Sequence, residues 1–191
     1  YITACTGFDA LSQAIESFWA LRHTPFSDTH ALRAATLVLE HLESAVRAPL
    51  DRGARFAMSL AASEAGLAIS QTRTTAVHAV SYPFTALFGI SHGHACALTL
   101  AWFIRYNVPA LAGDRGVALW RAMGVSSPDA AAERVERLME RVGLERSLSR
   151  LGIDEAGLDR VVEDGFRPDR VGNNPKELTP DALREILQAI Y

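Results

Sequence analysis

The stretch TGFDALSQAIES, from Thr6 to Ser17, decides the fold that we predict for this chain. Its apolar residues recur at helical spacing, so we expect a helix from about residue 6 to residue 20. Asp9 and Gln13 are four positions apart in this helix and therefore lie on one face. One short segment thus predicts both a buried helical stripe and a polar pair with metal-ligand chemistry.

Helices are predicted along the rest of the chain as well, because apolar residues recur at helical spacing behind suitable cap residues. The second helix is expected to begin at Ser27 or Asp28. Residues 127–128 and 179–180 pair a hydroxyl cap with a proline, which is typical of a helix start. Convincing strand patterns do not appear. We therefore predict one all-α domain over residues 1–191, with further helices from about residues 51, 74, 92, 127 and 179 and a more solvated bundle after residue 112.

Composition places the 191 residues among soluble globular proteins, with 49% hydrophobic and 21% charged residues. The net charge of -3 predicts no broad attraction to nucleic acid or to an anionic membrane. Neither a transmembrane run nor a signal-peptide pattern is present. The two cysteines, Cys5 and Cys96, show no ligand spacing with each other, which favours a reduced, cytoplasmic protein. A glycine-rich dinucleotide motif is also missing from this chain.

Several histidines accompany the Asp9–Gln13 pair. His78 lies within an apolar stretch, and His92 and His94 stand together in the segment SHGHA, residues 91–95. A carboxylate, an amide oxygen and imidazoles are ligands that a divalent metal accepts. Spacings of this kind also arise by chance. The alternative to a metal site is that Asp9 caps a helix or forms an ion pair, Gln13 is a surface residue, and the histidines are hydrogen-bonded core residues.

Three segments, residues 6–17, 77–83 and 89–95, together resemble the metal-dependent, iron-type alcohol dehydrogenase family. In that family an aspartate and a residue one turn later bind metal, and two histidines fourteen positions apart complete the site, as His78 and His92 are spaced. The resemblance covers essentially the whole chain. It implies the helical C-terminal domain of the dehydroquinate synthase-like fold. It also implies an N-terminal Rossmann-like domain for NAD(H) or NADP(H), absent from this chain, with the active site between the two domains.

Two positions depart from the family pattern, which usually has histidine where Gln13 and Tyr82 stand. An amide oxygen is a harder and weaker ligand than imidazole, so we expect Fe²⁺ first, with Mn²⁺ or Zn²⁺ as the alternatives. Loss of the metal, as in the related maleylacetate reductases, is the alternative. Tyr82 is expected either to join a proton relay or to pack as an ordinary aromatic residue. The phosphonoacetaldehyde reductase subgroup carries Gln and Tyr at these two positions, and the chain resembles that subgroup.

The resemblance implies metal-assisted, NAD(P)H-dependent reduction of a small aldehyde, with phosphonoacetaldehyde giving 2-hydroxyethylphosphonate as the leading reaction. The dianionic substrate needs positive charge or aligned donors. The expected roles are metal binding by Asp9, Gln13, His78 and His92, proton delivery by Tyr82 or His94, and phosphonate binding by Arg73, Thr74 and Thr75. A homodimer is expected from the family only.

Other functions remain open at this point. They are a general iron-type alcohol dehydrogenase, a metal-free maleylacetate reductase-like enzyme, a lyase of the dehydroquinate synthase type and a helical metal-binding module without catalysis. The isolated chain is expected to fold without catalysing the reaction, because its hydride donor would be held by the other domain.

Overall fold

The computed structural model describes residues 1–166 and 171–191, and within them the regular structure is entirely helical, which confirms the all-α prediction. The helices are α1 (Ile2–Trp19), α2 (Pro25–Arg47), α3 (Arg52–Thr72), α4 (Ala76–Phe88), α5 (His92–Asn107), the 3-10 helix η1 (Val108–Ala110), α6 (Arg115–Ala122), α7 (Pro128–Arg141), α8 (Glu155–Gly165) and α10 (Pro180–Ala189).

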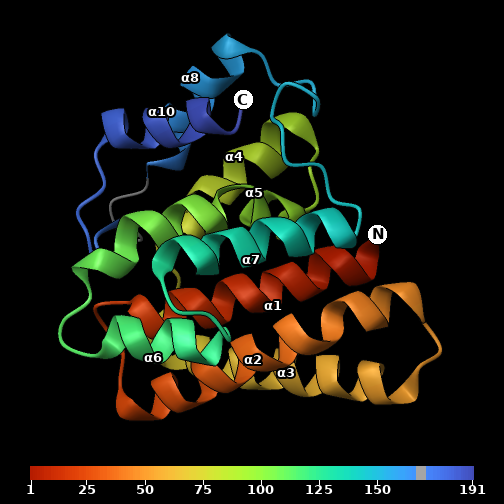
Figure 1. Ribbon diagram of the computed structural model, residues 1–191. Helices are drawn as coiled ribbons and strands as arrows, with labels where there is room; N and C mark the ends of the chain where they lie inside the picture. The colour runs from red at the N-terminus through yellow and green to blue at the C-terminus, as the bar shows by residue number, and fades with distance from the viewer. Residues whose placement is uncertain (167–170) are drawn as a thin grey trace.

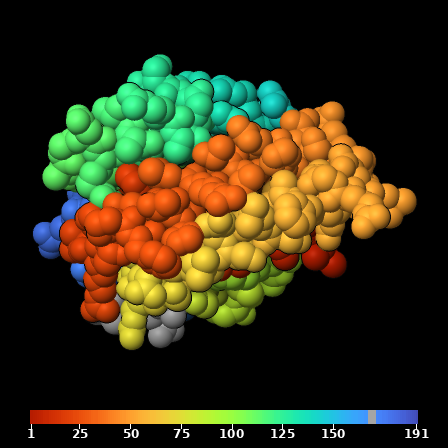
Figure 2. All heavy atoms as spheres, turned by 90° about the horizontal axis from the view of Figure 1, so that it is seen from below, coloured from red at the N-terminus to blue at the C-terminus, as the bar shows by residue number. Residues whose placement is uncertain are grey.

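Helix α1 is the centre of the arrangement and contacts α2, α3, α4 and α5 (Figure 1). Helices α2 and α3 pair with each other and cover one side of α1; seen from below, they form much of the surface (Figure 2). Helices α4 and α5 lie on the opposite side, with α7 against α5 and α8 against α4. Most of α1 is buried, and the buried part includes the polar side chains of Ser12, Glu16 and Ser17.

The helix starts were only partly predicted. Ser127 and Thr179 cap α7 and α10 as expected, each accepting a hydrogen bond of 3.1 Å from a backbone amide. The expectation that Ser27 or Asp28 starts α2 was wrong, because Thr24 is the cap and Pro25 occupies the first turn. Ser27 instead completes a capping box with Thr24, in which each side chain accepts from the other residue's amide.

Two further helices, α6 and α8, were not predicted from the sequence, and α1 begins at residue 2 rather than residue 6. Apolar residues of α6, α7, α8 and α10 join the same hydrophobic core as those of α1. The C-terminal half is therefore packed onto the N-terminal half rather than forming a separate bundle. Within the described residues, no helix combines the length and apolarity needed to span a bilayer.

Close contact between α1 and α5 depends on Gly93. A Cβ atom at this position would lie 1.9 Å from the carbonyl oxygen of Cys5 and 3.2 Å from the Cβ of Asp9. Only glycine permits this approach of the two backbones. The contact brings the first turn of α5 directly against the turn of α1 that carries Asp9.

Candidate metal centre

Four possible ligand groups from three helices converge where α1, α4 and α5 meet. They are Asp9 from α1, His78 from α4, and His92 and Cys96 from α5, with all four ligand atoms within 4.8 Å of one another. Asp9 Oδ1 lies 3.2 Å from His78 Nε2 and 3.6 Å from His92 Nε2. Three of the metal ligands predicted from the sequence, Asp9, His78 and His92, therefore lie together.

His78 is oriented by Glu16, whose carboxylate is fully buried on α1, two turns after Asp9. Glu16 Oε2 contacts His78 Nδ1, and Glu16 Oε1 accepts hydrogen bonds from the Thr75 amide (2.9 Å) and hydroxyl (2.6 Å). The Thr75 hydroxyl in turn accepts from Trp19 Nε1 at 2.8 Å. Because the carboxylate accepts the Nδ1 proton, the Nε2 lone pair of neutral His78 points at Asp9.

Ser81 orients His92 as Glu16 orients His78, by a contact at the Nδ1 atom of the ring. The Ser81 hydroxyl donates its only proton to the His78 carbonyl oxygen at 2.8 Å, and its oxygen lies 3.4 Å from His92 Nδ1. Ser81 can therefore act only as an acceptor toward His92, which assigns the imidazole proton to Nδ1. The Nε2 lone pair of His92 is left facing Asp9 and Cys96.

This arrangement aims two imidazole lone pairs at one carboxylate, which is unfavourable unless a cation or added protons lie between them. The pKa values respond accordingly. Burial lowers the pKa of His78, but Glu16, Cys96 and Asp9 together raise it well above its usual value. Burial raises the pKa of Asp9, yet His78, His92 and Gln13 together bring it below its usual value. Oriented imidazoles around a carboxylate form a donor set that fits a divalent metal.

Gln13 and Tyr82 border the cluster. Gln13 lies one turn after Asp9 and helps to lower the pKa of the Asp9 carboxyl. The ring of Tyr82 stacks on that of His92, with centroids 5.7 Å apart, and remains 38% exposed. Tyr82 therefore lies at the solvent-facing edge of the cluster, whereas His78 is buried.

His94, predicted to deliver a proton, is not brought to the cluster. Its Nε2 donates to the Glu145 carbonyl oxygen at 2.7 Å, and its Nδ1 lies 3.4 Å from the Tyr1 hydroxyl. Two residues along an α-helix turn a side chain about 200° around the axis, so His92 and His94 point to different sides of α5. This geometry corrects the expectation that His94 delivers a proton at the metal site.

The predicted phosphonate contacts are also partly corrected. Residues 73–75 connect α3 to α4 rather than forming a helical turn. Thr75 is fully buried, and its hydroxyl is used by Glu16 and Trp19, so it is not available to a substrate. Thr74 is half-buried and Arg73 is exposed. Arg73 has φ 62° and ψ 172°, a backbone region that is essentially restricted to glycine.

Glu16 and Cys96 are cluster residues that the sequence reasoning missed. Glu16 interrupts the apolar stripe of α1, seven positions after Asp9 and therefore on a similar face. Cys96 follows His92 by four positions on α5, which also places the two on one face. Both signals were present in the sequence, but neither identifies a partner on another helix.

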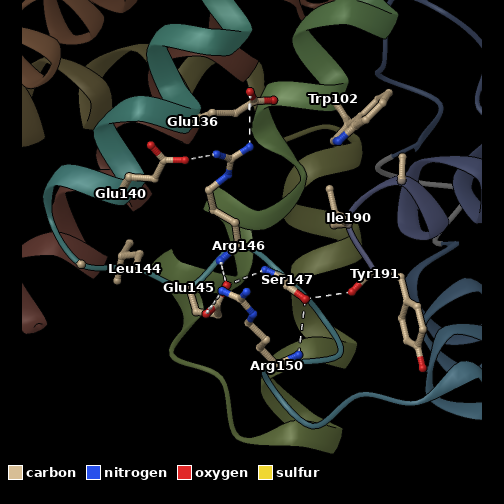
Figure 3. A pocket seen from close by; sticks show the side chains of 12 residues that line it. Trp102, Glu136, Glu140, Leu144, Glu145, Arg146, Ser147, Arg150, Ile190 and Tyr191 are labelled. Atoms are coloured by element: carbon tan, nitrogen blue, oxygen red, sulfur yellow. Dashed lines mark hydrogen bonds and ion pairs between the residues drawn. The ribbon is translucent and has the colours of Figure 1, made fainter.

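A separate hollow of about 740 Å³ lies between α5, the end of α7 and the C-terminus (Figure 3). Its charges are largely paired within the protein: Arg146 bridges to Glu136 and Glu140, and the Glu145 carboxylate accepts from two backbone amides. Ser147 donates to the Tyr191 carbonyl oxygen at 2.8 Å. These contacts tie the C-terminus to the loop after α7, and the hollow shares no lining residue with the metal cluster.

Asp9, His78 and His92 thus converge between the central helices of an all-helical domain. A profile of the Fe-containing alcohol dehydrogenase family, C-terminal, matches residues 3–191, and the chain belongs to this family.

Individual relatives are similar over the whole chain. A phosphonoacetaldehyde reductase from Streptomyces viridochromogenes is 36% identical over 94% of the chain and 47% of its own length. Long-chain-alcohol dehydrogenase 1 from Geobacillus thermodenitrificans is 30% identical over 100% of the chain and 50% of its own length. The crystal structure of sulfoacetaldehyde reductase from Bifidobacterium kashiwanohense in complex with NAD⁺ superposes with a TM-score of 0.94 at 40% identity, over 99% of this chain and 50% of that one. The chain thus spans about half the length of the relatives it matches.

Proposed function

We propose that this chain is the metal-binding part of an NAD(P)-dependent reductase of small aldehydes. The observation that carries the proposal is the convergence of the Nε2 atoms of His78 and His92 on Asp9 Oδ1, with Glu16 and Ser81 beside the two Nδ1 atoms. Asp9, His78 and His92 would hold the metal, and Gln13 lies beside them as the fourth ligand expected from the sequence. A divalent metal bound there supplies Lewis-acid polarisation of a carbonyl group.

The residues of this chain then have distinct tasks. Glu16 and Ser81 fix the ring orientations of His78 and His92. Tyr82, stacked on His92 at the exposed edge of the cluster, is positioned to contact the aldehyde and to hold the proton at its hydroxyl oxygen. NAD(H) or NADP(H) would be bound by a Rossmann-like domain elsewhere in the whole protein, since the relatives are about twice as long. A homodimer remains part of the proposal by family resemblance only.

We propose phosphonoacetaldehyde as the substrate, with 2-hydroxyethylphosphonate as the product. Two similar proteins are named for reducing two-carbon aldehydes that carry an anionic group, a phosphonate in one and a sulfonate in the other. Arg73 is the cation that we assign to this group. It precedes Thr75, which is hydrogen-bonded through Glu16 to His78. An arginine held in a glycine-like backbone conformation supports a role beyond that of a solvated surface residue.

The proposal is tested with the whole enzyme by following NADH and NADPH oxidation with phosphonoacetaldehyde, sulfoacetaldehyde and propionaldehyde. We expect the highest kcat/KM with phosphonoacetaldehyde, and loss of activity after chelation that returns with added metal. Sulfoacetaldehyde as the best substrate would keep the anionic class and change the assignment within it, which the 40% identity to a sulfoacetaldehyde reductase makes the second candidate. Propionaldehyde as the best substrate would indicate a general alcohol dehydrogenase, and activity unaffected by chelation would indicate a metal-free reductase.

A further inference from the structure

Cys96 is the one member of the cluster to which the proposed function gives no task. Its side chain is fully buried, one helical turn after His92 on α5. Its Sγ lies 3.9 Å from His92 Nε2 and within 4.8 Å of the ligand atoms of Asp9 and His78. The sulfur therefore borders the same small space as the two imidazole lone pairs and the carboxylate.

Three of the separations between these ligand atoms are close to those around one tetrahedral ion, and all of them are within 4.8 Å. Ligand atoms that each lie about 2.0–2.3 Å from a tetrahedral metal are about 3.3–3.8 Å from one another. The separations here are 3.2 Å between Asp9 and His78, 3.6 Å between Asp9 and His92, and 3.9 Å between His92 and Cys96. Small side-chain shifts would bring all four atoms into one coordination sphere.

The environment of Cys96 differs from that of an ordinary core thiol. Cys5 is also buried, but it lies outside the cluster although it is one turn before Asp9. Gly93, three positions before Cys96, brings the backbone of α5 against that of α1 beside Asp9. Gln13 meanwhile lies one turn after Asp9 and is among the groups that lower the pKa of the Asp9 carboxyl, which gives its amide a supporting role without a metal bond.

We infer that Cys96 is a metal ligand and that the site binds a divalent ion through Asp9, His78, His92 and the Cys96 thiolate, with Gln13 holding Asp9 in place. This inference rests on the proposed metal centre and changes its chemistry. Thiolate and imidazole ligands favour Zn²⁺ or Co²⁺ over the harder Mn²⁺ and Mg²⁺. The preference for iron or manganese that Gln13 alone implies is therefore reversed.

The test is titration of the chain with Co²⁺, because a thiolate bound to cobalt gives a charge-transfer band in the near ultraviolet that oxygen and nitrogen ligands do not give. Wild-type protein and the Cys5→Ser control are expected to show the band at one Co²⁺ per chain. Cys96→Ser is expected to lose the band and to bind Zn²⁺ about 100-fold more weakly, since even a residue that only orients a ligand is worth about 10–100-fold.

Wild-type spectra alone can overturn the inference, whether or not the variant folds. Stoichiometric cobalt binding without the charge-transfer band would mean that Cys96 is only a packing residue, while leaving the Asp9–His78–His92 centre intact. A band that is lost in Cys5→Ser but kept in Cys96→Ser would assign the thiolate ligand to Cys5 and would also overturn the inference. Absence of cobalt binding altogether, with Zn²⁺ and Fe²⁺ also failing to bind, would overturn the metal centre itself.

Discussion

His78 and His94 are equally buried, each 3% exposed, yet their surroundings differ in kind. His78 lies between two carboxylates, Glu16 on one ring nitrogen and Asp9 on the other. His94 lies between neutral groups, the Glu145 carbonyl oxygen and the Tyr1 hydroxyl, which satisfy both ring nitrogens. Burial therefore does not distinguish a ligand histidine from a structural one. The distinction lies in whether the second ring nitrogen faces a carboxylate or a neutral group.

The largest difference between the two regions is expected when each imidazole is removed. His78→Ala should lower metal affinity by at least about 100-fold, because a ligand is lost and Glu16 loses the Nδ1–H donor that it accepts from. His94→Ala should keep the metal but destabilise the fold by about 1–3 kcal/mol, since buried partners lose their hydrogen bonds. Metal content and thermal unfolding of both variants measure the contrast. Loss of metal from folded His94→Ala would contradict it.

Gly93 stands between the two regions, so a methyl group there should disturb both. Gly93→Ala should destabilise the fold by about 3 kcal/mol, because the new Cβ would meet the Cys5 carbonyl oxygen and α5 would have to move away from α1. Gly66→Ala is the matched control: it lies inside α3, has no atom within 4 Å of the added methyl, and should be neutral or stabilising. Denaturant unfolding compares the two; equal stabilities would show that α1 and α5 adjust freely.

The carboxylate behind His78 provides a finer test. Glu16→Gln keeps the shape but removes the charge that favours the Nδ1 proton, and should weaken metal binding by about 10–100-fold. Glu64→Gln is the control, because Glu64 pairs with His30 outside the cluster. Isothermal titration with Zn²⁺ of both variants gives the ratio. Similar affinities for Glu16→Gln and the wild type would mean that Glu16 stabilises the fold without orienting the ligand.

The smallest expected effect concerns Arg73, on the connection that leads to His78. Arg73→Gly should stabilise the protein by about 1–2 kcal/mol by relieving the positive φ, yet lower kcat/KM for phosphonoacetaldehyde by about tenfold. The rate with propionaldehyde should change little, because that substrate carries no charge. Steady-state kinetics of the whole enzyme with both aldehydes decide the matter; equal losses would make Arg73 a structural residue.

The sequence by itself determined the fold class and much of the site. Helical periodicity and cap residues predicted the helices that carry Asp9, His78 and His92, because both signals are local in the chain. Helices α6 and α8 were missed because they are short and, unlike the ten-residue α10, do not begin with a hydroxyl cap followed by proline. Family resemblance joined His78 to His92 at the correct separation, which local patterns alone left open.

Only the tertiary structure decided which side chains meet. Glu16 and Cys96 belong to the cluster because α4 and α5 pack against one face of α1, and no local pattern specifies that packing. Asn107 and Asn174, 67 positions apart, likewise exchange two buried side-chain hydrogen bonds of 2.9 and 2.7 Å. His94 and Thr75 were misassigned because sequence spacing gives a direction on one helix but not the neighbour that it faces. Contacts between distant segments depend on how whole helices fit together, and here that fit is set by the close approach at Gly93.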